Sequence, residues 1–172
     1  MHSLRHLAQD QAKPIDPSQF QSVLLGEVLK DTLSEFQALA AMRDVQLHTR
    51  LSRRSVWVHP LSLQRLVRNL LSNALRYGAS GGKVLLGTRL QGERLWLWCI
   101  DRGEGMSQAQ LEACFKAFGN SGNSSHIPQS LGLGLFSVKQ LALHMQTPVR
   151  VRSQSGKGVA IGIGLAVTAP RH

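Results

Sequence analysis

The sequence predicts a two-layer α/β sandwich, in which helices cover one face of a mixed β-sheet. Segments in which apolar residues recur at helical spacing alternate with short runs that have the period of a strand. A Gln-Gly turn between two apolar runs predicts an antiparallel hairpin near the middle of the chain. With 172 residues, 42% of them hydrophobic, the chain is long enough for one domain whose core needs neither disulfide nor metal.

The two ends of the chain are expected to lie outside this domain. Residues 1–19 are polar and contain Pro14 and Pro17, which is typical of a linker or of the tail of an upstream helix. We therefore assign residues 20–168 to the folded domain and residues 169–172 to a C-terminal tail.

The first half of the domain is predicted to contain two helices and two short strands. Apolar residues recur at helical spacing over Phe20–Met42, and Val45–Leu51 and Ser55–Val58 have strand patterns. Pro60 is tolerated in the first turn of a second helix, which we expect over Leu61–Tyr77. The apolar face of this second helix consists of Leu63, Val67, Leu70, Leu71 and Ala74.

The second half is predicted to contain a hairpin, two helices and two closing strands. The hairpin strands are Lys83–Leu90 and Arg94–Ile100, and a short helix follows at Gln108–Phe118. Gly119–Ser130 holds Gly, Asn, Ser and Pro with almost no apolar residue, so we expect a mobile loop. The remaining elements are a helix at Leu133–Met145 and strands at Val149–Ser153 and Val159–Val167.

The charge of the chain is strongly basic. The formal net charge is +10, and no Asp or Glu occurs after Glu112, whereas six Lys and Arg residues do. Such a balance suits a polyanionic ligand, either a triphosphate or a nucleic acid, and serves solubility equally well. Because the cations are scattered rather than clustered, we expect no nucleic-acid partner.

Cysteine usage and hydropathy favour a cytoplasmic protein. Cys99 and Cys114 each lie in an apolar stretch, which is typical of reduced core thiols rather than of a disulfide framework. No apolar run approaches the roughly 20 residues that cross a bilayer, so we expect no membrane segment in this chain, although a larger parent protein could be anchored in the inner membrane.

A polar stripe runs along the helix predicted over Leu61–Tyr77. Asn69 and Asn73 are four residues apart and share a face, which Arg76 and Tyr77 extend by one turn. Asparagine is a poor helix former, and an amide oxygen is a ligand that Mg²⁺ accepts while it takes the rest of its shell from phosphates and water. Arg76 could meet a phosphate. The alternative is an ordinary solvated helix face.

A second group of candidate residues follows the second hairpin strand. This apolar strand leads to Asp101 and into a turn that contains Gly103 and Gly105, with Met106 directly after it. A carboxylate at a strand end can accept a hydrogen bond from the exocyclic amine of adenine, and glycines let a flat base approach the backbone. Asp-x-Gly-x-Gly is also a common loop, so an ordinary turn is the alternative.

A third group opens the helix predicted at Leu133–Met145. Gly132, Leu133, Gly134 and Leu135 lie where free backbone N–H groups and the helix dipole favour phosphate. No Gly-Lys-Ser/Thr follows, so this is not a Walker A loop, and the glycines could instead serve as a loop hinge. The fourth motif, Gly-Lys-Gly at residues 156–158, is by itself an ordinary hairpin turn.

The order of these four motifs resembles the catalytic ATP-binding domain of bacterial sensor histidine kinases, a branch of the GHKL superfamily that also includes gyrase-type ATPases. The resemblance covers about residues 20–167. It implies the Bergerat fold, with residues 119–131 as a mobile ATP lid. The matching segments are Asn69–Tyr77 for the N box, Asp101–Gly105 for the G1 box, Phe115–Phe118 for the F box, Gly132–Leu135 for the G2 box and Gly156–Gly158 for the G3 turn.

The resemblance also implies a role for each site residue. Asn73 resembles the Mg²⁺ ligand, and Asp101 resembles the carboxylate that reads adenine. The catalytic group would be Asn69, Asn73 and Arg76. The nucleotide contacts would be Asn69, Asn73, Arg76, Tyr77, Asp101, Gly103, Gly105, Met106, Gly132, Leu133, Gly134 and Leu135.

The amide at Asn69 favours phosphoryl transfer over hydrolysis. Gyrase-like ATPases carry a Glu at the matching position, and an amide cannot act as a general base. The resemblance therefore implies a protein-histidine kinase that uses ATP and Mg²⁺ and phosphorylates a dimerisation and phosphoacceptor domain, with a response regulator downstream. The chain has no His-Glu/Asp-x-Arg motif, so we expect the acceptor histidine in the parent protein and a monomer for this chain alone.

Two positions depart from the family pattern. Ser130 stands where many kinases have the first G2 glycine, and Val159 replaces a frequent Thr. Neither change removes a metal or adenine contact. Two alternatives stay open at this point: an anti-sigma-type serine kinase of the same fold, and a degenerate relative without catalysis.

Overall fold

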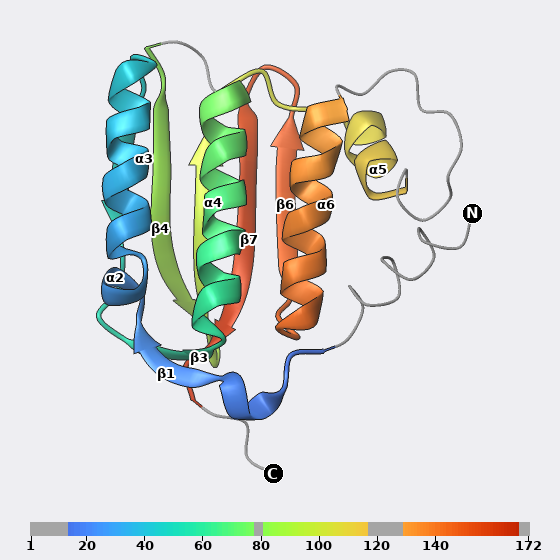
Figure 1. Ribbon diagram of the computed structural model, residues 1–172. Helices are drawn as coiled ribbons and strands as arrows, with labels where there is room; N and C mark the ends of the chain where they lie inside the picture. Colours follow the sequence, from blue (N-terminus) through green and yellow to red (C-terminus); the bar gives the residue numbers. More distant parts are fainter. Residues whose placement is uncertain (1–13, 78–80, 117–128, 169–172) are drawn as a thin grey trace, which may run out of the picture.

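A computed structural model describes residues 14–77, 81–116 and 129–168, with side chains for all of these except residues 77, 113–116 and 129–134. Four helices lie on one face of a sheet, and a fifth lies beside α6 at the edge of the helix layer (Figure 1). The helices are α2 (Leu25–Val28), α3 (Lys30–Met42), α4 (Pro60–Tyr77), α5 (Gln108–Lys116) and α6 (Gln129–His144), preceded by the 3-10 turn η1 (Pro17–Gln19).

The sheet of the described chain has seven strands in the order β1-β3-β7-β5-β4-β2, with β6 also paired to β7. Only β2 and β4 run parallel, and all the other pairs are antiparallel. The predicted fold class, a mixed sheet with helices on one face, is confirmed. The strands are β1 (Gln21–Leu24), β2 (Gln46–Arg50), β3 (Ser55–Val58), β4 (Lys83–Gln91), β5 (Arg94–Asp101), β6 (Val149–Gln154) and β7 (Gly158–Ala166).

The core lies between α4 and the middle strands. The predicted apolar face of α4 is confirmed, because all five of its members are buried. Against them pack Leu95 and Leu97 of β5 and Ile163 and Leu165 of β7. Each fully buried leucine contributes about 2 kcal/mol relative to an exposed one. This packing fixes α4 over the end of β5, which positions the polar residues discussed below.

The prediction of one helix over Phe20–Met42 is wrong in its first part. Gln21–Leu24 forms β1, which pairs antiparallel with β3, and helix begins only at Leu25. The pattern misled because Val23 and Leu24 fit either period. The free edge of β3 decides between the two, because β1 pairs with it and satisfies the backbone N–H and C=O groups along that edge. A helix at residues 21–24 would leave those groups of β3 without a strand partner.

The predicted start of the last helix is also wrong. Helix α6 begins at Gln129, four residues before the expected Leu133, so the glycines 132 and 134 lie inside the helix rather than at its start. Two residues at the end of the loop predicted over Gly119–Ser130 are therefore helical. The rest of that loop, and Phe118 of the F box, lie outside the described residues.

Candidate functional site

Asp101 is the last residue of β5 and points toward the helix layer. Strand alternation places Leu97, Cys99 and Asp101 on this face, and all three are buried, with Asp101 at 8% exposure. One carboxylate oxygen, Oδ1, accepts a hydrogen bond from the backbone N–H of Gly103 at 2.9 Å. Burial raises the pKa of Asp101, and backbone N–H donors at Gly103 and Val159 partly oppose that rise.

The turn after Asp101 is locked onto the β6–β7 turn. Gly105 has φ +66° and Gly158 has φ +88°, a region that favours glycine, and a Cβ on either would meet backbone atoms of the other turn. The Ser153 hydroxyl accepts from Met106 N at 2.7 Å, and Gly156 N donates to the Glu104 carbonyl at 2.6 Å. The G1 and G3 motifs are therefore two halves of one backbone assembly.

Asn73 on α4 faces the same cavity as Asp101. Its amide nitrogen Nδ2 is buried and has no hydrogen-bond partner within the described part of the chain. A buried amide without a partner carries a desolvation cost that a ligand can relieve. The last two residues of the predicted stripe lie at the end of α4, where Arg76 is exposed and the side chain of Tyr77 is outside the described part of the chain.

The cavity between α4 and the ends of β5 and β7 is small and largely apolar. Its volume is about 20 Å³, room for about one water molecule. A planar base therefore enters only if wall side chains such as Met106 and Leu135 move outward. The walls are Leu70, Asn73, Ala74, Cys99, Asp101, Met106, Leu135, Val159 and Ile161.

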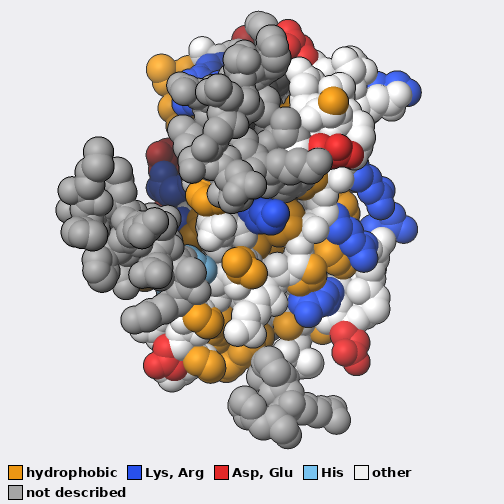
Figure 2. All heavy atoms as spheres, turned by 90° about the vertical axis from the view of Figure 1, so that its right-hand side faces the viewer, with side chains coloured by type: hydrophobic (Ala, Val, Ile, Leu, Met, Phe, Trp, Pro, Cys, Tyr) orange, Lys and Arg blue, Asp and Glu red, His pale blue; other side chains and the backbone are white. Residues whose placement is uncertain are grey.

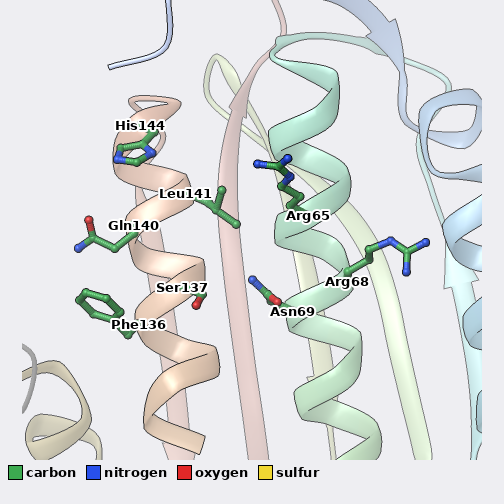
Figure 3. Close-up of a pocket in the computed structure, with 8 residues that line it drawn as sticks. All are labelled: Arg65, Arg68, Asn69, Phe136, Ser137, Gln140, Leu141 and His144. Atoms are coloured by element: carbon green, nitrogen blue, oxygen red, sulfur yellow. The ribbon is translucent and has the colours of Figure 1, made fainter. Parts of the chain in front are cut away.

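Asn69 lies one turn before Asn73 and faces a different space. It lines a groove of about 470 Å³ between α4 and α6, where it points toward Ser137, and Arg65 points toward Leu141 (Figure 3). Arg68 turns away from this groove toward α3, and its guanidinium donates to Glu35 Oε1 at 3.1 Å. The structure thus divides the two asparagines between neighbouring hollows.

The G2 residues are placed only in part. Gly132, Leu133 and Gly134 lie in the first two turns of α6. Leu135, the last of the four, is 3% exposed and forms a wall of the cavity beside Asp101. The structure therefore brings Asn73, Asp101, Met106 and Leu135 to one cavity, with Gly103 and Gly105 shaping the turn beside it.

Sequence reasoning missed several residues of the site. Val159 and Ile161 of β7 and Cys99 of β5 line the cavity, and Ser153 holds the G1 turn. Strand alternation offered a signal, because Cys99 is two residues before Asp101 and must share its face. Burial raises the pKa of Cys99 to about 12, so its thiol stays protonated and acts as an apolar wall.

The described residues contain no cluster of three or more His, Cys, Asp or Glu side chains that could hold a metal ion. The described part of the chain also has no helix long and apolar enough to cross a membrane.

Comparison with known sequences gives one family. Residues 58–169 match the histidine kinase-, DNA gyrase B- and HSP90-like ATPases. The chain is 36% identical over 97 residues to the alginate biosynthesis sensor protein KinB of Pseudomonas aeruginosa, which covers 56% of this chain and 16% of that protein. It is 31% identical over 155 residues to the sensor protein kinase PmrB of the same species, covering 88% of this chain and 32% of that protein. The chain spans about a third or less of these relatives.

Solved structures agree with this result. The mycobacterial sensor histidine kinase MprB has a TM-score of 0.68 at 26% identity, with 85% of this chain and 96% of that chain covered. Full-length ShkA in complex with AMPPNP has a TM-score of 0.73 at 21% identity, with 97% of this chain and 35% of that chain covered. The second likeness, at its lower identity, shows the fold alone.

Proposed function

Because the chain belongs to the histidine kinase-, DNA gyrase B- and HSP90-like ATPases, as a catalytic ATP-binding domain of the bacterial histidine-kinase type, we propose that it binds Mg-ATP and transfers the γ-phosphoryl group to a protein histidine. The acceptor would lie on a dimerisation and phosphoacceptor domain of the parent kinase, and a response regulator would act downstream. The observation that carries the proposal is that one cavity holds a buried carboxylate and an amide nitrogen with no hydrogen-bond partner among the described residues.

Asp101 is the proposed adenine contact. A carboxylate has about four acceptor positions, and backbone N–H groups of Gly103 and Val159 use part of that capacity. The remaining positions can accept the exocyclic amine of adenine. Leu70, Met106 and Ile161 supply apolar surface for the faces of the base. A buried charged acceptor of this kind rejects bases that lack the amine, because the carboxylate would then be left unsatisfied.

Asn73 is the proposed protein ligand of Mg²⁺. Its side chain lines the cavity, and an amide oxygen fits the preference of Mg²⁺ for oxygen ligands. When bound, the ion would neutralise charge that develops on the phosphates. A single protein ligand is consistent with a Mg²⁺ ion that enters the site already bound to the phosphates of ATP.

Asn69 supports transfer to a protein rather than to water. An amide cannot take a proton from water at neutral pH, so no general base for hydrolysis is present at this position. Phosphoryl transfer relies on positioning, and the groove beside Asn69 leaves this side of α4 accessible from the helix layer. Arg76 is exposed at the end of α4, where it can meet a phosphate without displacing core residues.

Nucleotide titration tests the proposal. Calorimetry with Mg-ATP and with its non-hydrolysable analogue is expected to show binding by the wild-type chain. The affinity of Asp101→Asn should be lower by about tenfold or more, because a charged acceptor is lost. Glu93→Gln is the matched control, since Glu93 is an exposed carboxylate in the β4–β5 turn, just before the other end of the strand that Asp101 ends. Unchanged affinity in Asp101→Asn, with the same fold by circular dichroism, would reject the adenine assignment.

Two further measurements distinguish the metal contact from the adenine contact, and phosphorylation of histidine from phosphorylation of serine. Asn73→Ala is expected to lose the gain in affinity that Mg²⁺ gives, while it keeps binding in the presence of EDTA. A separately supplied acceptor domain of a sensor kinase should become phosphorylated, with an acid-labile product. An acid-stable phosphoserine would instead identify an anti-sigma-type kinase.

A further inference from the structure

The face of the sheet that the helices leave uncovered carries two stacked tryptophans. The strand register places Trp96 opposite Gly164 and Trp98 opposite Gly162 of β7. The two indole rings lie 6.0 Å apart with an interplanar angle of 29°. A Cβ on Gly162 would come within 2.8 Å of the Trp98 ring, and one on Gly164 within 3.0 Å of Trp96. The glycines of β7 therefore allow both indoles to lie flat on the sheet.

Two arginines of β6 cover these rings. The guanidinium carbon of Arg150 lies 3.9 Å from the Trp96 ring centre, and that of Arg152 lies 5.4 Å from the Trp98 ring centre. Arg150 also donates to Gln91 Oε1 at 2.8 Å, and Trp96 is only 3% exposed beneath it. Stacking and this hydrogen bond hold the Arg150 guanidinium in place, which lowers the entropy cost when a partner binds.

The same face carries further positive charge. Alternation along β4 and β5 places Arg89 and Arg94 on it, and Arg94 donates to the Gly164 carbonyl at 2.8 Å. The only ion pair among the described residues lies on the helix side, between Arg68 and Glu35. We define the cationic face as Arg89, Arg94, Trp96, Trp98, Arg150 and Arg152.

Lys and Arg side chains gather to the right of centre in Figure 2, on the side away from the helix layer of Figure 1. Apart from Asp101, which accepts a hydrogen bond from Gly103 N, the described carboxylates nearest along the chain are Glu93 in the β4–β5 turn and Glu104 in the G1 turn, beyond opposite ends of β5. Neither forms an ion pair with the arginines of the cationic face. The positive charge of this face is therefore not neutralised within the described part of the chain.

One end of the cationic face is hollowed. A depression of about 290 Å³ has Arg152 and Lys157 at its wall, with Ile100 and Ala160 contributing apolar surface. Such a hollow can receive one apolar side chain while two cations meet the acidic groups beside it. This depression shares two lining residues, Asp101 and Val159, with the cavity on the helix side, whereas Arg152 and Lys157 line the depression alone.

We propose that the cationic face is a docking surface for an acidic segment of a partner protein, one that presents carboxylates to Arg150 and Arg152 and an apolar side chain to the hollow. Tryptophan and arginine are enriched where proteins meet, and the guanidinium fork binds carboxylates through two parallel hydrogen bonds. A lipid surface or a single-stranded nucleic acid would need free indole faces, for insertion or for base stacking. Here Arg150 covers Trp96, so the face fits carboxylates better.

The test uses the 172-residue chain without nucleotide, so its result does not depend on the proposed kinase function. The probe is a fluorescent peptide of alternating glutamate and leucine, with a lysine-leucine peptide of equal length as the negative probe. Anisotropy is expected to report binding of the acidic peptide alone. Arg150→Gln with Arg152→Gln should weaken that binding about tenfold, because two charge-assisted pairs are lost.

The control removes equal charge from the helix side. Lys30→Gln with Arg43→Gln neutralises two cations at the ends of α3 and should leave peptide affinity unchanged. Equal weakening in both double variants would overturn the proposal, because net charge alone would then account for the binding. Arg150→Lys with Arg152→Lys keeps the charge and the fold but loses the guanidinium fork, so an affinity between wild type and the Gln variant is expected.

Two competing ligands complete the test. Phosphatidylglycerol vesicles and a DNA duplex are titrated in parallel at low and at physiological salt. Binding of either through Arg150 and Arg152, without binding of the acidic peptide, would overturn the assignment of a protein partner. Nucleotide affinity should be unchanged in the single variant Arg150→Gln, because Arg150 lines neither the cavity beside Asp101 nor the depression that shares Asp101 with it.

Discussion

The two faces of β5 put neighbouring residues to opposite uses. Toward the helices, Asp101 is buried in a cavity of about 20 Å³ whose other walls are almost all apolar. Toward the open side, Arg150 and Arg152 lie on the rings of Trp96 and Trp98. On the helix side, burial of one carboxylate carries a free-energy cost of desolvation. On the open side, several arginines keep their charges near water, so the desolvation cost is small.

This contrast shows where a charge can recognise a ligand with high selectivity. A buried carboxylate loses much if its partner is wrong, so it can discriminate one base from another. Exposed arginines lose little, so they favour charge and shape over chemical detail.

The largest effect is expected for Gly158→Ala, at the end of the β6–β7 turn that packs against the turn after Asp101. The new Cβ would meet the Asp101 carbonyl and come within 2.7 Å of Arg102 Cα, and the backbone has φ +88°. A backbone clash has no flexible side chain to absorb it, so we expect a loss of about 3 kcal/mol or more in the free energy of unfolding. Urea denaturation of wild type and variant measures it.

Gly156→Ala is the matched control for this variant. Gly156 has φ +78°, close to that of Gly158, but nothing lies within 4 Å of its added Cβ. It should cost only about 1–2 kcal/mol, from the left-handed conformation. Equal losses in the two variants would show that the contact between the G1 and G3 turns does not contribute.

The second prediction concerns the pH dependence that Asp101 gives. Its folded-state pKa is raised above the ordinary 3.8, so between the two pKa values the folded chain keeps a proton that the unfolded chain has lost. Stability from this group is present at low pH and falls as pH rises through the folded-state pKa, by at most about 1.4 kcal/mol per pH unit. Unfolding of wild type and Asp101→Asn across this range gives the difference.

Asp101→Asn should remove that slope and be at least as stable as wild type at neutral pH. The same variant is expected to bind nucleotide poorly, so stability and binding move in opposite directions. If this variant is less stable than wild type at neutral pH, the hydrogen bonds of the carboxylate to Gly103 and Val159 stabilise the fold by more than its desolvation destabilises it.

On the open side, Gly162→Ala should have a smaller effect than Gly158→Ala. Its Cβ would come within 2.8 Å of the Trp98 ring, which is a side chain and can shift, and φ is not positive. We expect a loss of about 1–2 kcal/mol with a change in tryptophan fluorescence. Fluorescence identical to wild type would mean that Trp98 does not lie on β7 in solution.

The smallest effect is expected for Arg150→Ala. The cation–π contact with Trp96 and the bond to Gln91 are partly exposed, so we expect a loss of about 0.5–1 kcal/mol. The indole of Trp96 should become accessible, and acrylamide quenching measures that change. Quenching that stays at the wild-type level would contradict the position of Arg150 over the ring.

Features that depend on a short stretch of sequence were predicted correctly, and features that depend on distant residues were not. The polar and apolar faces of α4 follow from a period of 3.6 along one segment, and the β4–β5 hairpin follows from strand runs around a Gln-Gly turn. The strand at Gln21–Leu24 was missed because its pairing partner lies more than thirty residues away, in β3. The early start of α6 was missed because a glycine pair was read as a helix start.

The sequence alone determined the fold class, the motif order and the candidates Asn73 and Asp101, because each depends on residue type and spacing within a short window. Only the tertiary structure decided that Asn69 and Asn73 line different hollows, that Gly105 and Gly158 belong to one backbone assembly, and that arginines lie over tryptophans on the open face. These facts join residues distant along the chain. Strand pairing and close packing set such contacts, and neither leaves a local pattern.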